Sequence, residues 1–179
     1  TTAGYNTAVG YKALPNNTTG ERNTALGHNS MEDNTTGGYN TAVGMYSLLA
    51  NTTGAGNAAV GYGAGYSQTT SSYNTSLGSH ALHNTTTGAS NTSLGAYSML
   101  DNTTGGSNVA VGESSLADNT TGDYNIAIGK DSLRVNTTGS LNVAVGYQSL
   151  TVATTAGENT CLGAAAGRYI GSGANNTAI

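Results

Sequence analysis

Residues 40–56 read NTAVGMYSLLANTTGAG, and this 17-residue pattern repeats along the whole chain. Its first residue, Asn, is followed by a small or β-branched residue, a tiny residue, an aliphatic residue and Gly. The Asn recurs every 17 residues without insertion, at Asn6, Asn23, Asn40, Asn57, Asn74, Asn91, Asn108, Asn125, Asn142, Asn159 and Asn176. A fixed period of this length predicts a repeat architecture in which each unit contacts its neighbours. Positions of the unit are numbered from this Asn as position 1.

The period also sets the expected domain organisation. Ten complete units fill residues 6–175, with partial coils at residues 1–5 and 176–179. Neither end carries the atypical capping unit that a free solenoid needs, so we expect a window cut from a longer array.

Composition narrows the class of protein. Hydrophobic residues make up 36% of the chain, and Phe and Trp are absent, which leaves little material for a globular core. The charged fraction of 8% and the net charge of -4 are low for a disordered segment, so a regular solenoid is favoured. Five Lys and Arg in total form no basic stripe, which argues against nucleic acid and against an anionic membrane surface as partners. No apolar run is long enough to insert into a membrane.

Positions 2 to 4 read as a short β-strand. Side chains at positions 2 and 4 share one face of such a strand, and position 3 points to the other. Position 3 is always Ala, Ser or Cys, and position 5 is always Gly, so something packs very close to that side. Position 4 is always aliphatic: Val9, Leu26, Val43, Val60, Leu77, Leu94, Val111, Ile128, Val145 and Leu162.

A second extended stretch is expected around position 8, which is always Ala or Ser and is followed by Leu or Met in most units. Two strands with tiny facing residues predict a flattened β-roll. The remaining Asn-Thr-Thr-Gly segment has turn chemistry and returns the chain. The predicted fold is therefore all-β, a parallel β-solenoid of ten 17-residue coils, on the order of 50 Å long at the parallel-strand spacing.

The recurring Asn predicts a structural ladder. Stacked coils place its side-chain amides one above another, where they can hydrogen-bond along the stack. The predicted ladder residues are Asn6, Asn23, Asn40, Asn57, Asn74, Asn91, Asn108, Asn125, Asn142 and Asn159. We favour this role over ligand binding.

Burial is the weak point of an isolated roll. Each coil offers about two large aliphatic side chains, contributing roughly 1.5 to 3 kcal/mol each, against ordering 17 residues at about 1 kcal/mol or more apiece. If small residues fill the interior, the position 4 side chains form an apolar stripe outside. Such a stripe marks a partner surface, and self-association is the expected solution.

The run Asn-Thr-Ala-Val-Gly-x-x-Ala/Ser-Leu, as in residues 6–14, 40–48 and 142–150, resembles the coil motif of YadA-like heads in trimeric autotransporter adhesins. Similar coils occur in some phage tail-fibre proteins. The resemblance implies a left-handed parallel β-roll, a homotrimer and an exposed adhesive or spacing role, at the cell surface or on a virion. The present coil is longer by its Asn-Thr-Thr-Gly loop.

No catalytic, cofactor or metal site is expected. His28, His80 and His83 stand at unrelated positions of the unit, and Asp33, Asp101 and Asp118 recur only at position 11, as solvated loop residues. Cys161 replaces Ala or Ser at position 3 and is interpreted as a small buried residue without a disulfide, metal or catalytic partner. The N-glycosylation tripeptides beginning at Asn17, Asn51 and Asn136 are interpreted as by-products of the loop chemistry.

Eleven tyrosines crowd the loop edges. Those at position 17, Tyr39, Tyr73 and Tyr124, are candidate contacts for a host-surface protein or glycan, although they could simply cover the coil edge. The paired Thr columns raise ice binding as a less favoured alternative. The expected function is a structural and adhesive fibre segment, extracellular and not an enzyme, with a phage tail-fibre shaft or receptor-binding segment as the alternative.

Overall fold

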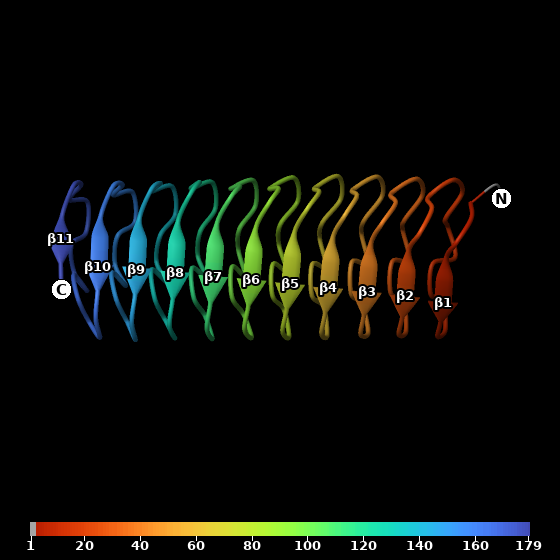
Figure 1. The fold of residues 1–179 in the computed structure, drawn as a ribbon, viewed down its shortest axis with the longest axis horizontal. Coiled ribbons are helices and arrows are strands. Elements are labelled where there is room, and N and C mark those ends of the chain that lie inside the picture. The colour runs from red at the N-terminus through yellow and green to blue at the C-terminus, as the bar shows by residue number, and fades with distance from the viewer. Residues whose placement is uncertain (1–2) are drawn as a thin grey trace.

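The computed structural model describes residues 3–179, so Thr1 and Thr2 of the first partial coil lie outside the described residues. One sheet of parallel strands runs the length of the molecule in chain order (Figure 1). The strands are β1 (Thr7–Val9), β2 (Thr24–Leu26), β3 (Thr41–Val43), β4 (Ala58–Val60), β5 (Thr75–Leu77), β6 (Thr92–Leu94), β7 (Val109–Val111), β8 (Ile126–Ile128), β9 (Val143–Val145), β10 (Thr160–Leu162) and β11 (Thr177–Ala178). The predicted parallel β-solenoid with 17-residue coils is confirmed.

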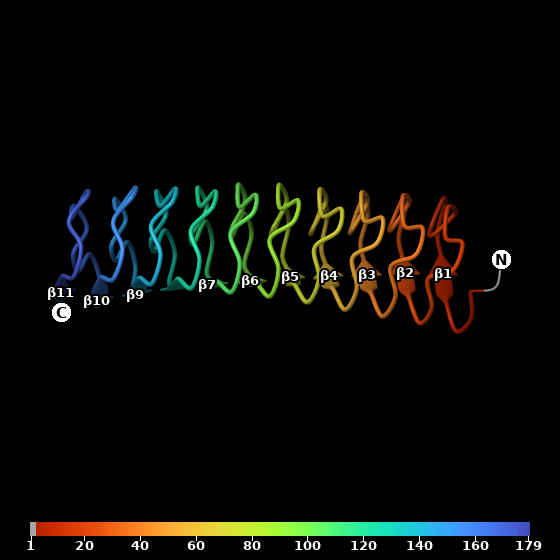
Figure 2. The same cartoon turned by 90° about the horizontal axis from the view of Figure 1, so that it is seen from above.

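The register follows the sequence period without a slip. Thr24 pairs with Thr41, Ala25 with Ala42 and Leu26 with Val43, and the same positions pair between the other coils. Seen from above, the strands lie along one side of the stack and the turn segments along the other (Figure 2). The first and last strands, β1 and β11, lie at opposite ends of the rod (Figure 1).

The expected second strand around position 8 is wrong. Within residues 3–179, only positions 2 to 4 form strands, and the segment after Gly at position 5 is a series of turns. Residues at positions 7 and 9 have left-handed backbone conformations, such as φ 56° at His80 and 51° at Leu82. Adjacent residues of a strand point to opposite faces, whereas these left-handed residues let Ala81 and Leu82 both point inward.

The turn segments are nevertheless hydrogen-bonded from coil to coil. The N–H of Leu82 donates to the Ser98 carbonyl at 3.1 Å, and the N–H of His80 donates to the Tyr62 carbonyl at 2.9 Å. A buried polar backbone group needs such a partner, and stacking supplies it at positions that no strand covers.

The interior combines small residues with one large residue in most coils. Position 3 and position 8 side chains face each other, as shown by Ser93 and Ser98, whose hydroxyls hydrogen-bond to each other. The large residue is the one at position 9: Met31, Leu48, Leu82, Met99, Leu116, Leu133 and Leu150 are fully buried. A left-handed Leu costs about 1 to 2 kcal/mol, while its full burial contributes roughly 1.5 to 3 kcal/mol, so burial offsets the strain at position 9.

Two coils lack the position 9 side chain, and position 12 compensates. A Cβ on Gly65 would lie 2.8 Å from Gln68 Nε2 and 3.0 Å from Leu48 Cδ2, so these side chains occupy the missing volume. Near Gly167 the same space is taken by Cys161 and Ile170. The buried core is divided into two clusters, one from Ala25 to Ala64 and one from Leu82 to Cys161, and the division falls at Gly65.

Candidate functional site

The outward face of the sheet carries an uncovered apolar stripe. We define it by the position 4 residues Val9, Leu26, Val43, Val60, Leu77, Leu94, Val111, Ile128, Val145 and Leu162. Their side chains lie in one column because the register pairs position 4 with position 4 in neighbouring coils. They are exposed or half-buried, with Val9 at 55% and Leu94 at 42% of full exposure. The neighbouring position 2 column holds Thr, Val, Ile and Ala, so neither column contains a charge.

This exposure is unusual for the sheet type. Parallel sheets of α/β proteins are covered on both faces by the helices that connect their strands, and their strands are rich in aliphatic residues. Here the inner face is packed by position 8 and position 9 side chains, and the outer face meets solvent in the single chain. An apolar column that runs the length of a rod is a candidate interaction surface.

The position 1 asparagines form a buried ladder, but with different partners from those expected. Asn108 Oδ1 accepts from the main-chain N–H of Asn125 in the next coil at 2.8 Å. Asn108 Nδ2 donates to the Gly122 carbonyl of its own coil at 2.9 Å. Each amide therefore links two coils and also closes its own coil, between the strand and the return loop. Direct amide-to-amide contacts occur toward the C-terminal end, as from Asn142 Nδ2 to Asn125 Oδ1 at 3.1 Å.

The ladder predicts a large cost for losing one amide. In Asn108→Ala the buried N–H of Asn125 loses its acceptor, which costs roughly 1 to 3 kcal/mol in addition to the cavity left behind. We expect chemical denaturation to show a loss of about 2 to 3 kcal/mol. Thr121→Ala, at an exposed position of the same coil, is the control and should change stability little. Equal stability of the two variants would contradict the structural role.

A second amide ladder runs at position 12, where sequence reasoning saw only turn chemistry. Asn119 Nδ2 donates to Asn102 Oδ1 at 2.7 Å and to the Gly122 carbonyl at 3.0 Å. The ladder residues are Asn17, Asn34 and Asn51 in one run and Asn102, Asn119 and Asn136 in another. Gln68 and Thr85 interrupt it between the runs. The recurrence of Asn at position 12 was the available signal.

This ladder also buries the asparagines of the N-glycosylation tripeptides. The side chains of Asn51 and Asn136 are fully buried, and that of Asn17 is 9% exposed. Their Nδ2 atoms donate to position 15 carbonyls, as from Asn17 to Gly20 at 2.9 Å. A sugar on these nitrogens would have to break the folded coil, which supports their interpretation as loop chemistry.

The two Thr columns differ. At position 13 the hydroxyl donates to the next coil, as from Thr120 Oγ1 to the Thr137 carbonyl at 2.8 Å. At position 14 the side chains are exposed, for example Thr121 and Thr138. One column of hydroxyls therefore faces solvent along the return loop.

The position 17 tyrosines do not form one surface. Tyr39 packs with Arg22, whose guanidinium carbon lies 5.1 Å from the ring centre and whose Nη1 donates to the Tyr39 hydroxyl. Tyr73 lies over Gly56. Tyr124 is exposed in a different coil, three units beyond Tyr73, with Ser90 and Ser107 at position 17 between them.

A continuous array of rings lies instead on the edge formed by positions 6, 7 and 10. This aromatic edge consists of Tyr11, His28, Tyr46, Tyr62, Tyr66, His80, His83 and Tyr97. Ring centres of neighbours are 4.8 to 6.3 Å apart. All three histidines belong to it, so the expectation that they are unrelated is wrong. They occupy positions 6, 7 and 10, which the turns bring to one edge.

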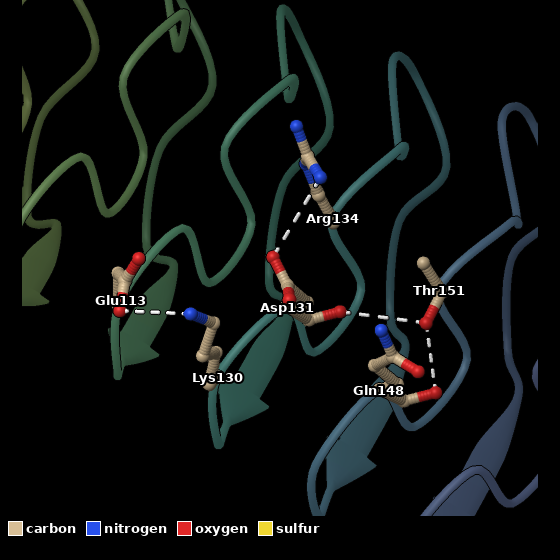
Figure 3. Close-up of polar contacts among 6 residues, drawn as sticks. All are labelled: Glu113, Lys130, Asp131, Arg134, Gln148 and Thr151. Carbon is tan, nitrogen blue, oxygen red and sulfur yellow. Dashed lines mark hydrogen bonds and ion pairs between the residues drawn. The ribbon is translucent and has the colours of Figure 1, made fainter.

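The same edge changes character in the later coils. Figure 3 shows Glu113, Lys130, Asp131, Arg134, Gln148 and Thr151 at these positions in coils 7 to 9. Lys130 Nζ lies 3.0 Å from Glu113 Oε2, and Arg134 Nη1 lies 3.7 Å from Asp131 Oδ1. The ring contacts are therefore confined to the first six coils, residues 6–107, where the edge also holds the Lys12–Glu32 ion pair at 2.9 Å. Charged side chains predominate in the next two coils, and Tyr147 follows in the ninth.

The remaining chemical candidates are few. Cys161 is buried, and burial raises the pKa of its thiol, which keeps it protonated. Within residues 3–179 no pocket is present, and no group of three or more His, Cys, Asp or Glu side chains could hold a metal ion. No helix in this described range has the length and apolarity needed to cross a membrane.

The fold and its ladders define the class of this protein: a parallel β-solenoid repeat protein. Comparisons with protein-family models, with curated proteins and with solved structures found no match for this chain. We therefore infer its function from the geometry of its surfaces.

Proposed function

We propose that this chain is a structural and adhesive repeat segment of an exposed fibre, in which three copies associate through the apolar stripe. The single observation that carries the proposal is that stripe, because it exposes aliphatic side chains along the whole outer face of a parallel sheet. Burying it against protein contributes roughly 25 cal/mol for each Å² of apolar surface removed from water.

A further copy of the chain is the occupant that fits this surface best. Its stripe has the same 17-residue repeat, so side chains can interlock at every coil. Positions 2 and 4 carry no charge, so association does not strand a buried ion. The resemblance to YadA-like heads supports three copies and a left-handed coil.

The segment is proposed to be neither enzyme nor nucleic-acid-binding module. Its buried polar side chains are Asn, Ser, Thr and Gln of the repeat, most of them hydrogen-bonded as parts of the coil, as Asn91 and Asn119 are. Nine acidic residues against five Lys and Arg offer no attraction for phosphate backbones. We place the segment outside the cell, on a cell surface or a virion.

The proposed partner is a host-surface protein or glycan, held by weak contacts repeated along the rod. A phage tail-fibre shaft or receptor-binding segment is the second candidate, and the same stripe favours it equally. Ice binding has less support, because the position 13 hydroxyls are used within the stack and only the position 14 column faces water.

Beads coated with the oligomer test the adhesive role against host cells, matrix proteins and glycans. Two triple variants compare the candidate contact surfaces: Tyr39, Tyr73 and Tyr124 to Ala at position 17, and Tyr11, Tyr62 and Tyr97 to Ala on the aromatic edge. We expect wild-type beads to bind and one triple variant to lose binding with an unchanged circular dichroism spectrum. Wild-type beads that bind none of these surfaces would contradict adhesion and leave a passive shaft.

A further inference from the structure

Two imidazoles of the aromatic edge meet in one coil. His80 and His83 have ring centres 5.0 Å apart, with planes inclined by 41°. Both rings border Gly63 of the preceding coil: a Cβ there would lie 3.4 Å from Cδ2 of each ring. Nε2 of His80 would lie 3.7 Å from the same Cβ, and Nε2 of His83 is bonded to a Cδ2 that approaches it. Other coils carry Tyr46 or Tyr97 at the position of Gly63, and here the two imidazoles cover the buried Gly instead.

The hydrogen bonds fix which nitrogen of His83 is free. Asn84 Nδ2 donates to Asp101 Oδ1 at 2.6 Å, which identifies the other amide atom, Oδ1, as the acceptor. Nδ1 of His83 lies 2.9 Å from that oxygen and must therefore carry the proton. Nε2 is then left with its lone pair. This chain of carboxylate, amide and imidazole is the kind of outer-shell support that metal-binding histidines have.

His80 likewise has no hydrogen-bond partner at Nε2 in the described part of the chain. Its Nδ1 lies 3.0 Å from the Ser79 hydroxyl, so the nitrogen that is already engaged is again Nδ1. The neutral imidazole is the form that binds metals.

We propose that Nε2 of His80 and Nε2 of His83 together bind one transition-metal ion of the Zn²⁺, Ni²⁺ or Cu²⁺ class. Imidazole nitrogens suit these ions, and metal–nitrogen bonds of about 2.1 Å with angles of about 90° to 109° at the metal place the two ring centres roughly 4.6 to 5.3 Å apart. The observed separation of 5.0 Å falls in this range.

No third His, Cys, Asp or Glu completes the set in the part of the chain that the structure describes. The other coordination positions go to water or to an oxygen or nitrogen ligand from outside. The site is thus open and lies on the partly exposed edge between Tyr62 and Tyr97, whose ring centres are 5.0 and 5.4 Å from that of His80.

Calorimetric titration of the untagged chain with NiCl₂ at neutral pH tests the site. We expect one ion per chain for the wild type. His80→Ala and His83→Ala should each weaken binding at least tenfold, because one imidazole is left. Asn84→Leu should weaken it about tenfold through the lost support of His83. His28→Ala is the matched control, since His28 lies on the same edge without a second imidazole beside it, and it should bind like the wild type.

A spectroscopic readout keeps the test independent of affinity. The electron paramagnetic resonance spectrum of bound Cu²⁺ should show two imidazole nitrogens in the wild type and one in His80→Ala or His83→Ala. The proposal is overturned if the wild type binds no ion, if the double variant of His80 and His83 binds as tightly as the wild type, or if His28→Ala weakens binding as much as His83→Ala does.

Discussion

Gly78→Ala should strongly destabilise the solenoid, although it adds only one methyl group. Gly78 is at position 5, has φ +136° and lies so close to the next coil that a Cβ would be 2.5 Å from the Gly95 carbonyl oxygen. The neighbour is backbone held in the stack, so it cannot move aside as a flexible side chain would. We expect a loss of about 3 kcal/mol and a melting temperature lowered by roughly 6 to 12 °C.

Two controls separate the causes of that loss. Gly171→Ala places a side chain at φ +67° with no atom within 4 Å, so it measures backbone strain alone and should cost about 1 kcal/mol. Gly4→Ala has open space and no positive φ, and it should melt like the wild type. Calorimetric melting of all three variants makes the comparison. If Gly78→Ala has the same melting temperature as Gly4→Ala, the coils can move apart at position 5 without loss of stability, and the close approach at Gly78 is not what holds them in place.

Leu77→Asp together with Ile128→Asp should dissociate the proposed trimer into monomers. Both side chains belong to the apolar stripe and are 42% and 39% exposed in the single chain, so the carboxylates stay solvated in a monomer. In a trimer each would be buried without a partner charge, at a cost of several kcal/mol. Sedimentation velocity at micromolar concentration should show the monomer mass for this variant.

The matched control puts the same charges on the other side of the same coils. Thr87→Asp with Thr138→Asp lies in the exposed position 14 column and should keep the oligomer. Dissociation by both double variants would point to general charge repulsion. An oligomer that survives in the stripe variant with a native circular dichroism spectrum would place the interface elsewhere.

The period made the stacking predictable, and the side-chain classes made one strand predictable. Ala42 between Thr41 and Val43 shows why: a tiny residue flanked by two β-branched ones identifies the packed face directly. The invariant Asn at position 1 likewise signalled a repeated amide contact, although its main-chain partner depends on the vertical offset between coils. Sequence spacing alone does not contain that offset.

The second strand was predicted wrongly because Ala81 and Leu82 were treated as alternating residues. A left-handed φ is uncommon for residues other than Gly, and Leu, unlike His, is not among the types enriched there, so no local propensity indicates it at Leu82. It arises because burial of Leu82 and the coil-to-coil hydrogen bonds outweigh the strain. This is tertiary packing overriding local preference.

The aromatic edge was missed for the same reason. Positions 6, 7 and 10 are neighbours only once the turn geometry is known, so His28, His80 and His83 looked unrelated along the chain. The sequence also did not reveal that Gln68 fills the space left by the missing side chain at Gly65. This substitution of volume can be recognised only once positions 9 and 12 are known to point inward. The available signal was that Gly at position 9 and a larger residue than Asn at position 12 occur in the same coil, as they do again at Gly167 and Ile170.

The mass of the unmodified 179-residue chain in solution tests the central claim most directly. Light scattering coupled to size-exclusion chromatography should give three times the chain mass of 17.8 kDa, because the uncharged apolar stripe of each copy is buried by the others. A stable, folded species of one chain mass across micromolar concentrations would contradict the account, since it would show that the exposed sheet face needs no partner.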